Sequence, residues 1–352
     1  MRLAMLLSLV FVGAVQAQEW NRFRGPNGTG VSAQRFPVSW TAKDYLWSAA
    51  IPGQGHSSPI FWQDHLYVTS SERKSGKRYV LCLDAKSGKE RWRREFNDDA
   101  YKLHKRNSIA TSTPCVDAER LYLTWATPDR YLVQAIDRHT GKDAWQVVLG
   151  SYKSQHGFGA SPILYEDILI LTNEQDKTGS LHALDAKSGK QLWKIPRNSG
   201  NATYSAPCIY QPTGRPAEII FTNWQHGITA VEPRTGKVKW EISCFEPQKQ
   251  ERAIASPIVA GDLVIGTCGF VTAQKHFVAV RPTADGKVEE VWRLEKAVAY
   301  MPTPIVHGDR IYSCSELGVF SCIEAKTGKV IWQDRLNNEF SASPVLAGNV
   351  VY

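Results

Sequence analysis

A short pattern recurs along the chain: an alternating apolar strand, a turn that contains glycine, and a second strand that ends in tryptophan. In five copies Gly precedes Trp by four residues; these are LCLDAKSGKERW, VQAIDRHTGKDAW, LHALDAKSGKQLW, ITAVEPRTGKVKW and FSCIEAKTGKVIW, ending at Trp92, Trp145, Trp193, Trp240 and Trp332. A sixth copy, VAVRPTADGKVEEVW, ends at Trp292 and carries two additional residues in its turn. Self-similarity at a fixed period decides the architecture of a chain, so this repeat constrains the fold more than any other feature.

A second signal alternates with the first: a small residue followed by proline, opening an apolar strand. The prolines are Pro59, Pro114, Pro162, Pro207, Pro257, Pro304 and Pro344. Proline is tolerated at the first residue of a strand, which fits this position. From Pro59 to Pro344 the chain covers 285 residues in six intervals, a mean period of 47.5. Four short strands with their turns fill such a unit, which predicts an all-β propeller with seven or eight four-stranded blades.

Helical repeats of similar length are the alternative, and the residue pattern argues against them. The units alternate apolar and polar residues with period two, are dense in β-branched residues, and place Gly or Pro every few positions. One blade cannot cover its own apolar faces, so we interpret the repeated Trp as a docking residue between neighbouring blades. The turn Gly supplies the positive φ of the hairpin, and Asp84, Asp137 and Asp185 are expected to accept turn hydrogen bonds.

The N-terminus predicts export. Arg2 precedes an apolar run, Leu3–Val15, and a small-residue pattern ends at Ala17, which is typical of a secretory signal peptide cut after Ala17. The run is too short to span a membrane, and no other segment approaches the roughly 20 apolar residues that a spanning helix needs. We therefore expect residues 1–17 to be a signal peptide and the mature protein to be periplasmic or secreted, without a transmembrane helix.

The two ends of the propeller region are expected to meet. Residues 18–46 are rich in Gly, Pro and Asn and predict an irregular arm, and residues 47–352 predict a single propeller domain. Trp47 resembles the end of a repeat strand without its own turn, so an N-terminal strand is expected to close the last blade. Ser343–Tyr352 begins a further blade, and we expect the natural chain to continue for roughly another half to one and a half repeats.

Charge and cysteine content exclude several classes of protein. The formal charge of +8 is scattered, with a local excess between Arg91 and Arg106 and no basic face with readout elements, so nucleic acid is not expected as a partner. Seven cysteines at irregular spacing show no disulfide framework and no zinc pattern. We expect them to behave as small apolar residues in strands.

These repeats resemble the pyrroloquinoline-quinone-like (PQQ-like) β-propeller repeat family, whose unit is a small-Pro strand, a second strand and A-x-D-x-x-T/S-G-x-x-x-W. The resemblance covers nearly the whole mature chain, and the segments WNRFRGPNGTGVS, GQGHSSP and HGFGASP resemble exported bacterial members. The family more distantly includes quinoprotein alcohol dehydrogenases and the outer-membrane assembly propeller BamB. A shared fold does not by itself imply a shared function.

The resemblance allows two opposite readings of activity. Quinoprotein dehydrogenases hold pyrroloquinoline quinone against an adjacent Cys-Cys disulfide, with a calcium ion bound by carboxylate and Asn and an Asp base. No two cysteines are adjacent here, and no acidic calcium set is evident, so no cofactor is expected. Pyrroloquinoline quinone with calcium stays the alternative that the resemblance implies. The chain also lacks G-x-S-x-G, P-loop and H-E-x-x-H signatures. The lipidated Cys of the assembly lipoprotein is also missing after the signal.

Candidate ligand-binding residues lie in the loops that precede the innermost strands, because propellers place ligands at the mouth of the central channel. The set is His56, Asn107, His156, Asn173, Arg197, Tyr204, Arg252 and Tyr300. His56 and His156 could bind a metal or exchange protons, or they could brace their turns. Arg197 is an anion contact or a surface charge, and Asn173 lines the channel or braces a loop.

The interpretation that fits these observations best is an exported, non-catalytic scaffold or binding propeller that acts through its faces or the mouth of its central channel. Cell-envelope or outer-membrane protein assembly is the process in which we expect such a protein. We expect a monomer whose partner is another protein or a cell-envelope polymer. The alternatives are a quinoprotein alcohol or sugar dehydrogenase and a propeller that binds a carbohydrate or another small ligand.

Overall fold

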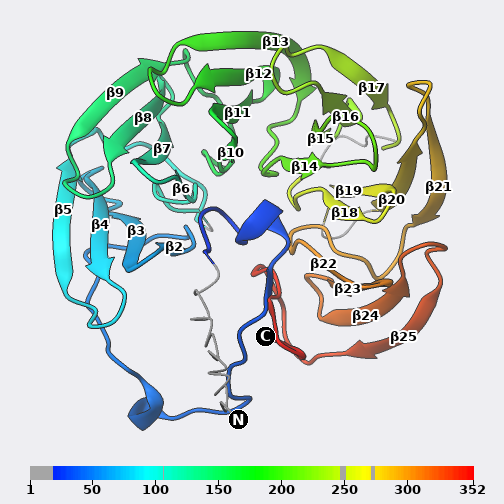
Figure 1. Ribbon diagram of the computed structural model, residues 1–352, viewed down its shortest axis with the longest axis horizontal. Helices are drawn as coiled ribbons and strands as arrows, with labels where there is room; N and C mark the ends of the chain where they lie inside the picture. The colour runs from blue at the N-terminus through cyan, green and yellow to red at the C-terminus, as the bar shows by residue number, and fades with distance from the viewer. Residues whose placement is uncertain (1–18, 106, 246–250, 271–273) are drawn as a thin grey trace, which may run out of the picture.

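The computed structural model describes residues 19–352 except for 106, 246–250 and 271–273. Six four-stranded antiparallel sheets stand around a central axis, each with its first strand innermost and its fourth at the periphery (Figure 1). We number these sheets as blades 1 to 6 in chain order. The arrangement confirms the predicted all-β propeller. The predicted signal peptide lies outside the described residues.

The strands of the six blades follow one another along the chain without crossovers. Blade 1 contains β2 (Ile60–Trp62), β3 (His65–Ser71), β4 (Arg78–Asp84) and β5 (Glu90–Phe96). Blade 2 contains β6 (Cys115–Val116), β7 (Arg120–Ala126), β8 (Tyr131–Asp137) and β9 (Asp143–Val148). Blade 3 contains β10 (Ile163–Tyr165), β11 (Ile168–Glu174), β12 (Lys177–Asp185) and β13 (Gln191–Gly200). Blade 4 contains β14 (Cys208–Tyr210), β15 (Glu218–Asn223), β16 (Gly227–Val231) and β17 (Val238–Ile242). Blade 5 contains β18 (Ile258–Ala260), β19 (Leu263–Gly269), β20 (Lys275–Pro282) and β21 (Val288–Leu294). Blade 6 contains β22 (Ile305–His307), β23 (Arg310–Cys314), β24 (Val319–Glu324) and β25 (Val330–Arg335).

A seventh, three-stranded sheet joins the two ends of the chain. Strand β1 (Val31–Ser32) lies parallel to β26 (Leu346–Ala347), which pairs antiparallel with β27 (Val350–Val351). An N-terminal strand therefore does join the last blade, but it comes from the arm and not from the segment around Trp47. The arm also contains two short 3₁₀ turns, η1 (Pro26–Gly28) and η2 (Ala42–Asp44). Across the described residues, no helix has the length and apolar character needed to cross a membrane.

At five junctions a tryptophan docks against the Gly turn of the following blade. At five places a Cβ added to the turn Gly would lie 2.5–2.9 Å from an indole; the pairs are Trp47 with Gly88, Trp92 with Gly141, Trp145 with Gly189, Trp193 with Gly236 and Trp292 with Gly328. In each pair the indole N–H donates to a backbone carbonyl of the same turn, at 2.8–3.0 Å. Only glycine fits, because the space is closed and φ is positive at each position. The core consequently lies between blades, since the main clusters of buried apolar residues combine residues of neighbouring blades.

Local chemistry aims each Trp at its neighbour. In all six blades the pairing of the third and outer strands shifts register directly after the residue opposite Trp, as between Ala183 and Leu184 beside Trp193. Such bulges increase strand twist and re-aim a side chain. The turn itself is closed as expected: Asp84 Oδ1 accepts the backbone N–H of Ser87 at 2.9 Å and its hydroxyl at 2.8 Å.

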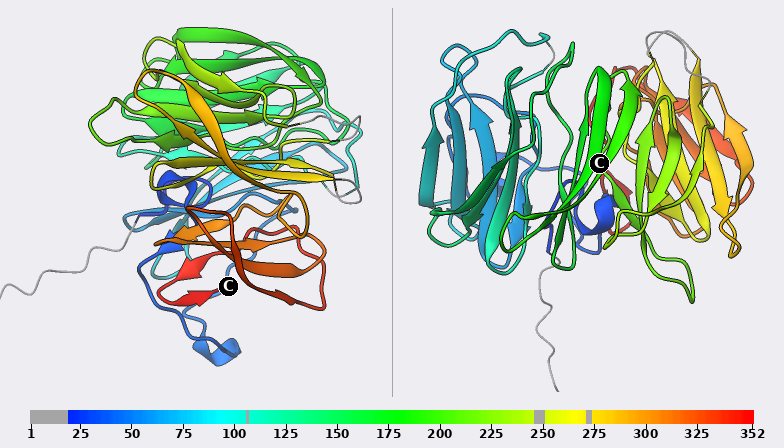
Figure 2. Two further views of the ribbon diagram at one scale, coloured as in Figure 1. Left: turned by 90° about the vertical axis from the view of Figure 1, so that its right-hand side faces the viewer. Right: turned by 90° about the horizontal axis from the view of Figure 1, so that it is seen from above.

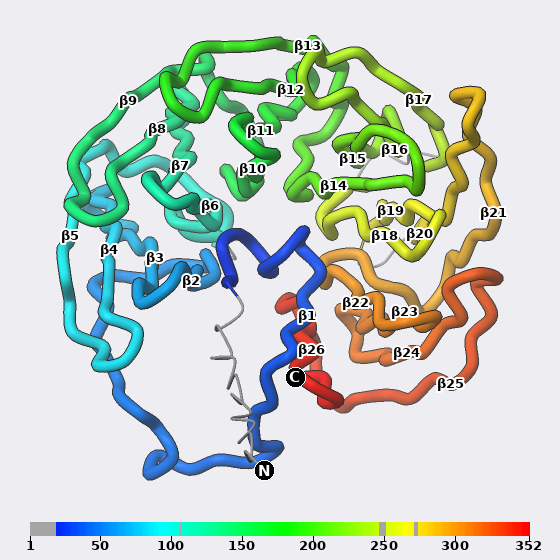
Figure 3. The backbone as a smooth tube through the Cα atoms, in the orientation of Figure 1, coloured from blue at the N-terminus to red at the C-terminus, as the bar shows by residue number. Residues whose placement is uncertain are grey.

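The N-terminal arm runs across the centre of the propeller, beside the innermost strands (Figures 2 and 3). We call the end where the Gly hairpins lie the hairpin face, and the opposite end, where the loops between blades lie, the mouth face. The guanidinium of Arg24 donates to the carbonyls of Pro304 (3.3 Å) and Pro344 (2.9 Å), and that of Arg22 donates to Pro207 (2.6 Å). Burial lowers the pKa of both arginines to about 10, so both remain charged at neutral pH. These bonds tie the arm to the starts of innermost strands in blades 4 and 6 and of the seventh sheet.

Candidate binding site at the channel mouth

The mouth is built by the loops that enter the innermost strands of blades 3 to 6. These loops carry His156, Tyr204, Arg252 and Tyr300, four of the residues that the sequence singled out. The loop of His156 turns at Gly157, whose φ is +90°, and a Cβ there would lie 2.3 Å from Leu103. Glycine is therefore required for the loop to pack this closely.

Direct contacts link the loops of blades 3, 4 and 5. The imidazole of His156 lies edge-on to the ring of Tyr204, with centroids 6.5 Å apart. The hydroxyl of Tyr204 shares a 2.5 Å hydrogen bond with Ser154, and Arg252 Nη2 donates to Gln155 Oε1 at 3.0 Å. Three of the predicted residues thus form one cluster.

Tyr300 lies at the same face but is almost fully buried. Its backbone N–H donates to Glu316 Oε2 at 3.3 Å, and its ring packs near Phe270 with centroids 6.4 Å apart. Burial raises the pKa of Tyr300, and the charge of Arg252 opposes that rise. The phenol is therefore neutral at physiological pH.

His104 belongs to the cluster although it was not predicted. Its ring lies 4.5 Å from that of His156, centroid to centroid, with an angle of 61° between the planes. It lies in the stretch between Arg91 and Arg106 where the sequence has a local excess of basic residues. No period or spacing connected His104 with a loop of the next blade.

His156 and Tyr204 lie near charges of both signs, the guanidinium of Arg252 and the carboxylate of Asp176. Burial lowers the pKa of His156, and the positive charge of Arg252 and the neighbouring His104 lower it further, while Asp176 opposes them. Burial also raises the pKa of Tyr204. Neutral imidazole and phenol groups both donate and accept hydrogen bonds, so the cluster can bind polar and aromatic groups beside one fixed cation.

Asn107 positions this site. Its side-chain amide donates to the carbonyls of His156 (2.7 Å) and Phe158 (3.3 Å), and its Oδ1 accepts the backbone N–H of Ser108. The amide nitrogen therefore ties the loop before blade 2 to the loop before blade 3, while Oδ1 braces its own loop.

The remaining predicted residues lie apart from the cluster. His56 is exposed, and its backbone N–H donates to Ala110 at 2.9 Å. Asn173 is buried and donates to the carbonyl of Leu149 at 3.3 Å, which braces a loop. Arg197 is buried inside blades 3 and 4, where it pairs with Glu174 (3.0 Å) and Glu241 (2.9 Å).

The carboxylates beneath the mouth face are engaged by basic residues. Glu174 pairs with Arg197, Glu316 forms an ion pair with Lys275, and Glu251 lies 3.6 Å from His276. All three carboxylates are buried. Asp176 accepts the backbone N–H groups of Gln155 and Ala202.

This donor set does not fit a calcium-bound quinone. Calcium takes six to eight oxygen ligands that include carboxylates, and no group of three or more His, Cys, Asp or Glu side chains in the described part of the chain is arranged to hold a metal ion. The seven cysteines are free and buried, as expected for small apolar residues, and no vicinal disulfide exists among them. We therefore derive no step through such a cofactor.

Comparison with known protein families gives a match along most of the chain. A family model described as "Outer membrane protein assembly factor BamB" matches residues 38–219, 217–316 and 289–352. The outer membrane protein assembly factor BamB of Shewanella oneidensis is 24% identical over 351 residues, covering 94% of this chain and 69% of that protein.

Dehydrogenases are equally similar. A polyvinylalcohol dehydrogenase of a Pseudomonas species is 26% identical over 337 residues, covering 78% of this chain and 50% of that protein. The chain thus spans only half of this relative, and it spans 21% of the quinone alcohol dehydrogenase subunit of Gluconacetobacter polyoxogenes.

Solved structures agree on the fold. A quinohemoprotein alcohol dehydrogenase of Pseudomonas putida HK5 superposes with a TM-score of 0.59 at 14% identity, covering 82% of this chain and 60% of that one. BamB of Moraxella catarrhalis superposes with a TM-score of 0.55 at 16% identity, covering 82% and 76%. At these identities the likeness shows the propeller fold alone.

Proposed function

The chain belongs to the family described as outer membrane protein assembly factor BamB, and on that premise we propose that it is an exported, non-catalytic binding propeller of the cell envelope. It holds a protein or an envelope polymer at the mouth face. One observation carries the proposal: loops of neighbouring blades gather His104, His156, Tyr204 and Arg252 at one face of the propeller.

The chemistry of the mouth supports binding more than catalysis. A recognition surface needs aromatic rings and a fixed cation, which are over-represented where proteins meet partners. Acid–base catalysis by a carboxylate would need one that neighbouring groups do not already occupy. At this mouth the nearby carboxylate of Asp176 accepts backbone N–H groups and the buried Glu316 pairs with Lys275.

Binding by the mouth is tested with two variants and a matched control. His156→Ala and Arg252→Ala should each weaken capture of envelope components by the immobilised protein at least tenfold, while the melting temperature changes little for His156→Ala. The control is Lys86→Ala, an exposed residue of a hairpin turn on the opposite face. Equal capture by all three variants would refute binding at the mouth.

A quinoprotein dehydrogenase is the second candidate, because relatives named as quinone-dependent alcohol dehydrogenases are as similar as the assembly factors. The test incubates the protein with pyrroloquinoline quinone and calcium and measures alcohol- or sugar-dependent reduction of a dye. We expect no reduction above a heat-denatured control. Sustained turnover would replace the binding proposal with an enzymatic one.

A further inference from the structure

At the junction of blades 4 and 5, the Trp does not bond to the turn of the next blade. Trp240, at the end of blade 4, donates its indole N–H to the carboxylate of Glu218 in its own blade at 2.7 Å, where the other docked tryptophans bond the next blade. The turn it faces in blade 5 carries the two additional residues. A Cβ on Gly286 of that turn would meet no described atom within 4 Å, so the turn Gly does not reach the indole.

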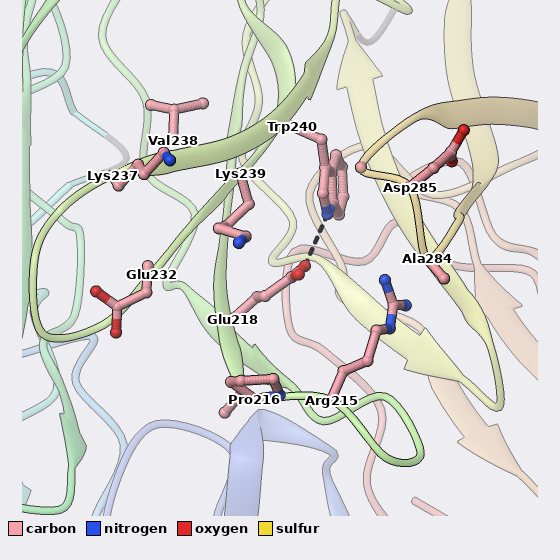
Figure 4. A pocket seen from close by; sticks show the side chains of 12 residues that line it. Arg215, Pro216, Glu218, Glu232, Lys237, Val238, Lys239, Trp240, Ala284 and Asp285 are labelled. Carbon is pink, nitrogen blue, oxygen red and sulfur yellow. Dashed lines mark hydrogen bonds between the residues drawn. The ribbon is translucent and has the colours of Figure 1, made fainter.

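The widened junction contains a cavity. It has a volume of about 300 Å³ and lies on the hairpin face, between β17, the start of β15 and the turn of blade 5 (Figure 4). This volume is at the lower end of the range for pockets that bind small molecules. Arg215 spans the gap at one side, with its guanidinium donating to the carbonyls of Pro282 (3.4 Å) and Thr283 (2.9 Å).

The lining of this cavity combines both signs of charge. Glu218, Glu232 and Asp285 are balanced by Arg215, Lys237 and Lys239. Glu218 is only 6% exposed, and one of its carboxylate oxygens accepts the indole N–H of Trp240. Figure 4 shows this carboxylate between the side chains of Lys239 and Arg215, below the indole of Trp240.

The arrangement selects a neutral ligand that both donates and accepts hydrogen bonds. An anion in the cavity would face the carboxylate of Glu218, and a cation would face Arg215 and Lys239. A hydroxyl group can donate to the carboxylate and accept from the ammonium at the same time. Adjacent hydroxyls on one ring repeat that pairing, which a single alcohol cannot do.

We propose that this cavity between blades 4 and 5 is a saccharide-binding site, with Glu218 accepting from ring hydroxyls and Lys239 donating to them. The site is separate from the channel mouth and lies on the opposite face of the propeller. It goes beyond the proposed function, because it supplies a second contact of defined chemistry. The two added residues of the blade 5 turn are what open it.

The experiment titrates the full chain with glucose, N-acetylglucosamine and their soluble oligosaccharides and follows saturation-transfer NMR signals of the sugars. Binding with a dissociation constant of about 10 mM or tighter is expected for at least one member. Ala284→Trp, at an exposed position of the turn, fills the cavity and should abolish the signal. Glu218→Gln keeps an acceptor for Trp240 and should weaken binding at least tenfold.

Matched controls separate this site from the mouth and from general loss of folding. Lys190→Ala, on the hairpin turn of an intact junction, and His156→Ala, at the mouth, should both bind the sugar as the wild type does. Absence of binding by every sugar overturns the proposal, as does binding that survives Ala284→Trp. Loss of binding in His156→Ala would move the sugar to the mouth and equally overturn it.

Discussion

Trp193 and Trp240 occupy the same position in neighbouring blades, yet they bond to opposite sides of their junctions. The indole of Trp193 donates across the junction to the carbonyl of Pro233, while that of Trp240 donates to Glu218 of its own blade. Both side chains are buried. The position of the Trp is therefore set by its own blade. The acceptor of its indole N–H depends on the length of the Gly turn in the next blade.

The comparison separates two contributions of the repeated Trp. One is burial of a large apolar surface, which both junctions share. The other is the close contact between an indole and the turn Gly of the next blade, which Trp193 makes and Trp240 does not. A turn that is longer by two residues removes the fit without removing the burial, and it leaves a cavity lined with charged groups.

The largest effect should come from removing a docked Trp. Trp193→Ala deletes a side chain that is 7% exposed and packed between blades 3 and 4, so we expect a loss of about 3–5 kcal/mol in the free energy of unfolding. Trp332→Ala is the matched control, since Trp332 is 44% exposed, and should cost less than about 1 kcal/mol. Urea denaturation followed by circular dichroism measures both. Equal losses would show that docking does not determine the contribution of the Trp.

Acid should weaken blade 3 through His182. Burial lowers the pKa of His182 to about 4, and Gln191 opposes the shift. The unfolded chain binds this proton near pH 6.5, whereas the folded chain binds it only at about pH 4. The free energy of unfolding therefore has its full value above pH 6.5 and falls by roughly 3 kcal/mol on acidification to about pH 4. Blade 4 has Thr229 at the same strand position and should add no such loss.

The matched variant for this prediction is His182→Gln, because Gln134 holds the equivalent position in blade 2. It should flatten the pH dependence of the unfolding free energy between pH 7 and pH 4.5. Identical slopes for the variant and the wild type would show that His182 does not titrate as its burial requires.

Replacing a turn Gly should destabilise the protein more where the Gly contacts an indole than where it does not. Gly236→Ala places a Cβ 2.7 Å from the indole of Trp193 at a φ of +74° and should cost about 2–3 kcal/mol. Gly286→Ala also has a positive φ, +83°, but meets open space, so only the backbone strain of about 1 kcal/mol remains. Melting temperatures of the two variants are compared directly. A larger shift for Gly286→Ala would contradict the docking account.

The smallest effect should come from Arg215, which bridges the widened junction. Arg215→Ala removes donors to two carbonyls of blade 5 and should cost about 1 kcal/mol. Arg234→Ala, at the junction of blades 3 and 4, breaks only exposed ion pairs with Glu166 and Asp167 and should leave the melting temperature unchanged. A larger drop in melting temperature for Arg234→Ala than for Arg215→Ala would show that exposed ion pairs stabilise the junctions more than the bonds of Arg215 do.

The blades could be predicted because each of their signals is local. The turn Gly, the strand-opening Pro and the terminal Trp lie within one repeat, and hydrophobic alternation fixes the strands between them. The sequence also placed His156, Tyr204 and Arg252 at one face, since each precedes its strand by a similar offset. Residues that act across blades carried no such signal.

His104 and Arg197 could not be placed from the sequence, because their contacts come from other segments of the chain. His104 meets His156 only because two loops of different length fold toward each other, and Arg197 is buried because Glu174 and Glu241 come from two different strands beside it. The N-terminal arm is a similar case. Arg22 donates to a carbonyl 185 residues along the chain, and Arg24 donates to one 320 residues along it. Long-range partners of this kind leave no pattern in a single sequence.

The most direct test of binding at the mouth compares the two faces within one experiment. A photo-crosslinking amino acid is placed at Gln155 on the mouth face or at Ser87 on the hairpin face, both outside the buried clusters, in cells that produce the protein. The account predicts a discrete crosslinked partner from Gln155 that disappears when Arg252→Ala is added, and none from Ser87. A partner captured equally from both positions, or only from Ser87, would contradict it.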